Sequence, residues 1–75
     1  MALIVGFEKD DREFRSLHPT EVVCKYILTE MDGRKVLQLN TYGSSDRENP
    51  NKLSQTIQLD ESAAQQLLSI LRSEF

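Results

Sequence analysis

The chemistry that this sequence could perform starts with its single histidine and its single cysteine, His18 and Cys24. A cysteine becomes a nucleophile when a neighbouring histidine takes its proton, so this pair is the first candidate for catalysis. His18 precedes Pro19 in a predicted loop, whereas Cys24 falls in a predicted strand with its side chain toward the core. We interpret the histidine as structural and the cysteine as a small buried hydrophobe, and we expect no enzyme activity.

The other polar residues do not assemble into a metal site or a phosphate loop. The acidic cluster of Asp10, Asp11 and Glu13 lacks the ligand order of a calcium loop and is typical of a solvated charged surface. One cysteine and one histidine are too few for a Cys/His metal site. The segment YGSSDR has neither the lysine nor the glycine spacing of a phosphate-binding loop. We therefore expect no cofactor and no metal.

Chain length, charge and apolar runs narrow the remaining classes of protein. The 75 residues form a single domain, 1–75, near the lower size limit for one hydrophobic core, so we expect a homodimer. The formal net charge of −3 argues against a surface that attracts nucleic acid everywhere. A lone cysteine allows no internal disulfide, MALIVGF is too short for a signal-peptide core, and no run approaches a membrane span. These features predict a cytoplasmic protein with no membrane partner.

A β-hairpin is the clearest predicted element. Residues 21–31 are rich in β-branched and aromatic types, and the dipeptide Asp32-Gly33 is typical of a type I′ turn, so the return strand covers 34–42. The turn fixes the register and divides the side chains between two faces. The first face, which we expect to be the core, pairs Leu28 with Leu37, Tyr26 with Leu39, and Cys24 with Thr41. The second face, which is half polar, pairs Thr29 with Val36, Ile27 with Gln38, Lys25 with Asn40, and Val23 with Tyr42.

The hairpin is followed by a loop, a third strand and a helix. The segment YGSSDRENPN predicts a loop, and alternation in KLSQTIQL predicts a strand whose polar side joins the half-polar face. Asp60 is a good N-cap for a terminal amphipathic helix over 60–75. Residues 1–20 are expected to form an N-terminal strand or arm, and 21–59 the sheet, giving an α+β fold: a small antiparallel sheet followed by one helix. The helix presents more apolar residues than one sheet face needs, so we assign the dimer interface to Leu67, Ile70, Leu71 and Phe75.

The half-polar face is the constellation that suggests a ligand. Single-stranded nucleic acid is bound by aromatic faces that stack bases, cations that meet phosphates and amides that reach base edges. A solvent-facing antiparallel sheet is also polar, so composition alone leaves both interpretations open. The candidate nucleic-acid-binding residues are Lys25, Gln38, Asn40 and Tyr42 in the hairpin, Arg34 and Lys35 at its turn, and Arg47 and Lys52 in the loop.

The order of these segments resembles a known family. DGRKVLQLNTY, SSDRENPNK and TIQLDESAAQQLLSIL follow one another as the hairpin, loop, short strand and terminal helix do in the single-stranded-DNA-binding domain of the transcriptional positive coactivators and their bacterial relatives. The resemblance covers residues 21–75. It implies a curved antiparallel sheet backed by a helix, dimerisation through the helices, and DNA across the strands. It assigns Arg34 and Lys35 to hairpin cations, Arg47 and Lys52 to loop cations, and Tyr42 to base stacking.

Two functional hypotheses follow. The first is a small nucleic-acid-binding protein that takes single-stranded DNA on its sheet face with weak sequence preference, in transcription or DNA metabolism. The alternative is a non-enzymatic protein-interaction or regulatory protein, associated with a phage or a defence system, that uses the same sheet face or the helix. The acidic run EKDDREFR and the low pI of about 5.0 fit the alternative better.

Overall fold

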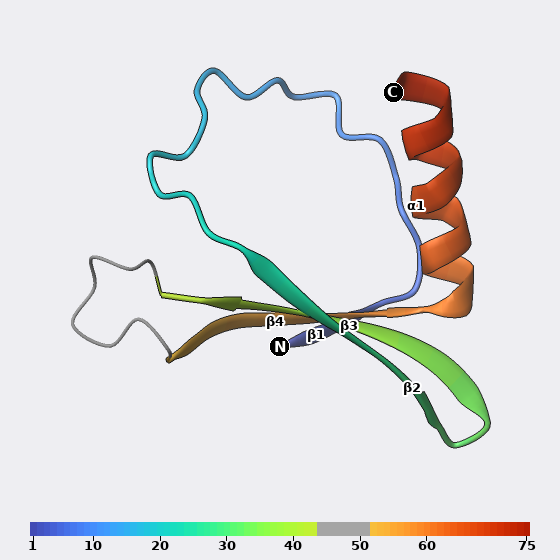
Figure 1. The fold of residues 1–75 in the computed structure, drawn as a ribbon. Coiled ribbons are helices and arrows are strands. Elements are labelled where there is room, and N and C mark those ends of the chain that lie inside the picture. Colours follow the sequence, from blue (N-terminus) through green and yellow to red (C-terminus); the bar gives the residue numbers. More distant parts are fainter. Residues whose placement is uncertain (44–51) are drawn as a thin grey trace.

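The computed structural model describes residues 1–43 and 52–75. Within them it has a four-stranded mixed sheet that does not close, followed by one helix, which confirms the predicted α+β class (Figure 1). The strands lie in the order β1-β4-β3-β2 across the sheet. The elements are β1 (Ala2–Ile4), β2 (Cys24–Met31), β3 (Arg34–Tyr42), β4 (Leu53–Asp60) and α1 (Glu61–Glu74). The predicted loop lies largely in 44–51, outside the described residues.

The hairpin of β2 and β3 has the predicted turn and register. Asp32 and Gly33 both have positive φ, 54° and 72°, as a type I′ turn requires. The pairs run from Met31 opposite Arg34 to Cys24 opposite Thr41, and every pair predicted within β2 is present. Val23 lies outside β2, so its expected pairing with Tyr42 is not part of the ladder.

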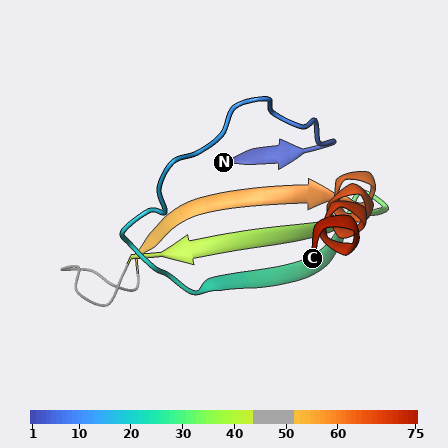
Figure 2. The same cartoon turned by 90° about the horizontal axis from the view of Figure 1, so that it is seen from above.

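The third predicted strand is confirmed, and the N-terminal residues add a fourth. β4 runs antiparallel to β3 with an irregularity at Thr41 and Tyr42, which is typical of a β-bulge. β1 pairs in parallel with the outer edge of β4, with Ala2 beside Ile57 and Ile4 beside Leu59. The sheet is therefore mixed and not purely antiparallel. Segment 5–23 then runs beside the helix and arches back to the start of β2 (Figures 1 and 2).

The helix begins where the N-cap prediction placed it. The Asp60 carboxylate accepts a hydrogen bond of 2.8 Å from the Ala63 backbone N–H, and the first turn carries Glu61 at the positive end of the helix dipole. The helix axis stands away from the sheet, so its first turns lie against β3 and β4 while its last turns extend beyond them (Figures 1 and 2). No helix among the described residues is long and apolar enough to cross a membrane.

The expected core face is largely uncovered in a single chain. Tyr26 is 69% exposed, Leu28 is 70% exposed, and Cys24 is exposed as well, so the prediction that these residues are buried is wrong for the isolated chain. The physical reason is the angle of the helix, which covers the sheet only near the end of β4. Among the described residues, the buried apolar side chains are Leu59 and Ala63.

Candidate nucleic-acid interface

One side of the sheet, here called the polar face, carries most of the predicted ligand-binding residues. Strand pairing places the alternate residues of three neighbouring strands on this side. They are Lys25, Ile27 and Thr29 from β2, Val36, Gln38, Asn40 and Tyr42 from β3, and Thr56, Gln58 and Asp60 from β4. The face combines one aromatic ring, amides, hydroxyls and charged groups.

A cation and an aromatic ring meet at one end of the polar face. The Nζ atom of Lys25 lies 5.1 Å from the centroid of the Tyr42 ring, within the range of a cation–π interaction. The Tyr42 residue is half-buried, whereas Lys25 is exposed at the edge strand. A ligand at this position would meet a positive charge and a ring face together, which is the pair that binds a phosphate and a base in single strands.

A chain of side-chain hydrogen bonds runs across the centre of the polar face. Gln58 Nε2 donates to Gln38 Oε1 at 2.9 Å, and Gln38 Nε2 donates to Asn40 Oδ1 at 3.0 Å. Thr56 Oγ1 donates to the same Asn40 oxygen at 3.1 Å. Asn40 is 6% exposed and Thr56 is 9% exposed, so these bonds satisfy polar atoms that water reaches poorly. We call Gln38, Asn40, Thr56 and Gln58 the amide ladder.

The turn end of the polar face has a paired cation. Arg34 Nη2 lies 3.5 Å from Asp60 Oδ2, with the Arg34 side chain 55% exposed and that of Asp60 16% exposed. An exposed pair of this kind is weak, yet the carboxylate reduces the positive potential around the guanidinium. Lys35 lies on the other face, opposite Glu30 of β2. The two hairpin cations predicted to act together therefore point to opposite sides of the sheet.

The loop cations are only partly described. Lys52 is exposed, and its carbonyl oxygen accepts a hydrogen bond of 3.2 Å from the backbone N–H of Gly43. Arg47 lies outside the described residues. Of the candidate set, the structure thus brings Lys25, Gln38, Asn40 and Tyr42 together with Arg34 toward the turn, and separates Lys35 from them.

The three residues that β4 contributes to this face, Thr56, Gln58 and Asp60, were not in the predicted site. The alternation of residues 53–59 had already placed Thr56 and Gln58 on the polar side of their strand. Their hydrogen bonds depend on the β3–β4 register, which the intervening loop does not fix as a two-residue turn would. Asp60 was recognised as the helix N-cap, and its contact with Arg34 follows from the same register.

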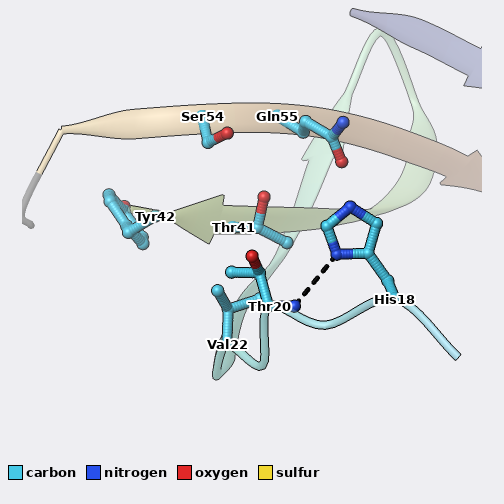
Figure 3. A pocket seen from close by; sticks show the side chains of 7 residues that line it. All are labelled: His18, Thr20, Val22, Thr41, Tyr42, Ser54 and Gln55. Carbon is cyan, nitrogen blue, oxygen red and sulfur yellow. Dashed lines mark hydrogen bonds between the residues drawn. The ribbon is translucent and has the colours of Figure 1, made fainter. Parts of the chain in front are cut away.

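A shallow cavity of about 290 Å³ lies beside the end of the hairpin, where the N-terminal segment meets the sheet (Figure 3). His18 Nδ1 accepts a hydrogen bond of 3.1 Å from the Thr20 backbone N–H, which fits the predicted structural role of this histidine. Cys24 is not among the lining residues, so the thiol and the imidazole do not share this cavity. The lining consists of His18, Thr20, Val22, Thr41, Tyr42, Ser54 and Gln55.

The acidic N-terminal cluster forms a local ion pair. Arg12 donates to the Asp10 carboxylate from its backbone N–H at 2.9 Å and from its guanidinium at 3.3 Å. These hydrogen bonds lower the pKa of Asp10, and both side chains are mostly exposed. Within 1–43 and 52–75 no three His, Cys, Asp or Glu side chains gather as metal ligands would.

The residues assigned to the dimer interface lie on the helix. Leu67 is half-buried within its own chain, whereas Ile70, Leu71 and Phe75 are 44%, 42% and 101% exposed. Leu67 is the least exposed of the four residues and Phe75 is the most exposed. This part of the helix is therefore apolar surface that its own chain does not cover.

Comparison with known proteins adds no relative. No protein-family model, no curated protein and no solved structure matches the chain. The resemblance to the coactivator family stays a prediction, and the fold and the polar face described above are the basis for any functional assignment.

Proposed function

We propose that this protein binds single-stranded nucleic acid, DNA in the first instance, on the polar face of its sheet and without enzymatic activity. The observation that carries the proposal is the Lys25 ammonium above the Tyr42 ring, beside the amide ladder. A base that takes the place of the Lys25 ammonium over the Tyr42 ring would leave that ammonium beside its phosphate, so one nucleotide engages both groups. A role in transcription or DNA metabolism, in the cytoplasm, is the biological setting we infer for such an activity.

The amide ladder argues for weak sequence preference. Gln38 Oε1 and Asn40 Oδ1 already accept hydrogen bonds from neighbouring side chains. A base edge that used these acceptors would have to break internal bonds, each of which has a net worth of about 1 kcal/mol. Stacking on the ring and contacts to phosphate do not require these internal hydrogen bonds to break. Binding through them depends little on which base is present.

The charge balance argues for modest affinity that salt weakens strongly. The chain carries a net charge of −3, and Asp60 offsets Arg34 on the polar face. Long-range attraction of the nucleic acid is therefore small, and the local contact to phosphate has to supply the electrostatic part of the binding energy. Each phosphate contact releases counterions, so affinity falls as salt rises.

Fluorescence anisotropy with labelled DNA tests the proposal. Single-stranded and duplex DNA of equal length are titrated with the protein at low salt and again near physiological salt. We expect micromolar or tighter binding that favours the single strand and weakens with salt, with similar affinities for oligonucleotides of different sequence. Absence of binding at low salt, where electrostatic attraction is strongest, would reject the proposal.

A protein partner is the second candidate, and the Arg34–Asp60 pair is the observation that favours it. On this face the Asp60 carboxylate neutralises one of the few cations. Such a face is better suited to binding a protein surface of mixed charge than to binding a polyanion. The same titration separates the two candidates. Failure to bind either form of DNA, together with recovery of one partner protein by the wild type but not by a Tyr42→Ala variant, would establish this alternative.

A further inference from the structure

The side of the sheet opposite the polar face is apolar and open. Strand pairing places Tyr26, Leu28, Leu37, Leu39, Ile57 and Leu59 on this side, here called the apolar face. Leu59 is 2% exposed beneath the helix, but Ile57 is 39% exposed and the β2 residues are more exposed still. The helix and the arch of segment 5–23 both stand on one side of the sheet (Figure 1). Leu59 of the apolar face is buried together with Ala63 of the helix, and Thr41 and Gln55, in register with the apolar face, line a cavity with His18 of that arch. Together these two observations place the apolar face on this side.

The total surface of the chain exceeds that of a compact monomer of the same mass. A compact monomer of 8.6 kDa has an accessible surface of about 4,700 Å², whereas this chain exposes 7021 Å². The excess is about 2,300 Å². The radius of gyration also shows that the chain is less compact than usual. It is 14.6 Å, whereas a compact domain of this length has about 11 Å.

The buried core is also too small to offset the entropy of folding. Leu59 and Ala63 are the buried apolar residues in 1–43 and 52–75. Ordering each residue of a chain costs about 1–2 kcal/mol in backbone entropy alone, and small domains need a core, a staple or a partner to balance it. The lone cysteine excludes an internal disulfide, and the described residues form no metal cluster. A partner surface is what remains.

We propose that a second copy of this chain covers the apolar face, with the last two turns of each helix lying on the partner's sheet. Those turns extend beyond their own sheet (Figure 1). They carry Ile70, Leu71 and Phe75, which are all exposed. Helix and apolar face stand on the same side, so one two-fold axis can place each helix on the other sheet in two equivalent contacts.

The area is of the size that a second copy would cover. An obligate homodimer buries about 1,000–2,500 Å² on each partner. The excess of about 2,300 Å² is of that order, and part of it belongs to the arch, where Phe14 and Leu17 are each 84% exposed. The two surfaces also complement each other, because the uncovered helix residues and the uncovered sheet residues are both apolar. The dimer differs from one made by helices alone, since Tyr26, Leu28 and Ile57 of the sheet become part of the interface. The polar face stays open, so the proposal does not rest on nucleic-acid binding.

Mass and thermal stability provide the first test. Light scattering after size exclusion is expected to give twice the chain mass of 8.6 kDa. The midpoint of thermal unfolding is expected to rise with protein concentration, because dissociation and unfolding are coupled. A particle of single-chain mass whose unfolding is cooperative and independent of concentration would overturn the proposal.

Adjacent residues of β2 provide the matched mapping test. In a Cys24→Ala background, Leu28→Cys places a thiol on the apolar face and Ile27→Cys places one on the polar face. Both positions are exposed in one chain, at 70% and 50%, so without a partner their thiols would be labelled at similar rates. We expect labelling at 28 to be roughly tenfold slower or more, because the dimer has to open first.

The outcomes of the mapping test are distinct. Slow labelling at 28 that becomes fast on dilution supports the proposed dimer. Equal, fast labelling at both positions, or slow labelling at 27 with fast labelling at 28, would show that the apolar face is not the interface. A charge provides a stronger perturbation than a thiol. Leu28→Lys is expected to abolish the dimer, whereas Ile27→Lys is expected to leave it intact.

Discussion

The Nζ atom of Lys25 lies 5.1 Å from the centroid of the Tyr42 ring, on the side of the sheet away from the exposed leucines. The contact joins the edge strand β2 to the central strand β3 beside the buried amide of Asn40. It places the two groups that the proposed nucleotide contact uses on one side of the sheet, and the opposite side is free for a different interaction. The two sides can therefore be tested independently.

Removal of the Lys25 charge should weaken nucleic-acid binding selectively. Lys25→Gln is expected to lower the affinity for single-stranded DNA by roughly three- to tenfold and the slope of log K against log salt by about one, because one phosphate contact is lost. Lys35→Gln is the matched control, since it removes the same charge from the same hairpin on the other face. Equal losses in both variants would show that the polar face is not the binding surface.

Neutralising Asp60 should have the opposite effect on binding. Asp60→Asn removes the carboxylate 3.5 Å from the Arg34 guanidinium, so that cation becomes available to phosphate. We expect the affinity for single-stranded DNA to rise by roughly two- to fivefold at low salt, and the gain to disappear at high salt through screening. Glu61→Gln removes a neighbouring charge from the helix and serves as the control. A similar gain in both variants would point to net charge alone.

The amide ladder should contribute measurably to stability. Thr56→Val keeps the shape of the side chain and removes the hydroxyl that donates to Asn40, so the free energy of unfolding should fall by about 0.5–1.5 kcal/mol. Thr29→Val makes the same change on the same face at an exposed position and should change it by less than about 0.5 kcal/mol. Urea unfolding at one fixed protein concentration measures both. Equal effects would mean that the ladder bonds contribute nothing.

The helix cap at Asp60 can be separated from its ion pair. Asp60→Ala removes the acceptor for the Ala63 backbone N–H and should cost about 1 kcal/mol of stability. Asp60→Asn keeps a capping oxygen and removes the charge, so its cost should be a few tenths of a kcal/mol. Thermal unfolding of both variants at one concentration decides the matter. If the two are equally destabilised, the charge and not the cap is what stabilises this junction.

The hairpin turn has room for a side chain at Gly33, but its backbone conformation there is one that residues other than glycine rarely adopt. A Cβ added at Gly33 would meet no atom within 4 Å, so Gly33→Ala tests only the positive φ of 72° and should cost about 1 kcal/mol or more of unfolding free energy. Gly6→Ala would place its Cβ at an ordinary contact distance from Gln66 and should be nearly neutral. A neutral Gly33→Ala in urea unfolding would mean that the turn rearranges.

Local patterns predicted the hairpin and the helix start because both are set by short segments. The dipeptide Asp32-Gly33 admits one tight turn, and that turn alone determines which residues of β2 and β3 face each other. Asp60 is the last residue of β4, and its carboxylate caps the helix. The preference of aspartate for the N-cap position makes this helix start predictable from the sequence. The polar face was therefore predictable in its hairpin half, including the proximity of Lys25 and Asn40.

Long-range geometry was not predictable in the same way. The angle at which the helix leaves the sheet depends on packing around Leu59 and Ala63, and no periodicity in the sequence encodes it. The assumption that an apolar strand face is covered by its own chain failed at Tyr26 and Leu28 for that reason. The parallel pairing of β1 also depends on a free edge of β4, which is a property of the finished sheet.

The pairing of β1 with β4 has a consequence for the order of folding. Ala2 lies beside Ile57, so nearly the whole chain must be in place before these three residues gain a partner. Closing so long a loop for a three-residue strand is entropically unfavourable until the hairpin and β4 already form a template. β1 should therefore join last and open first, with amide hydrogens that exchange faster than those of β3. We therefore expect β2, β3 and β4 to form a sheet first and β1 to add to its edge afterwards.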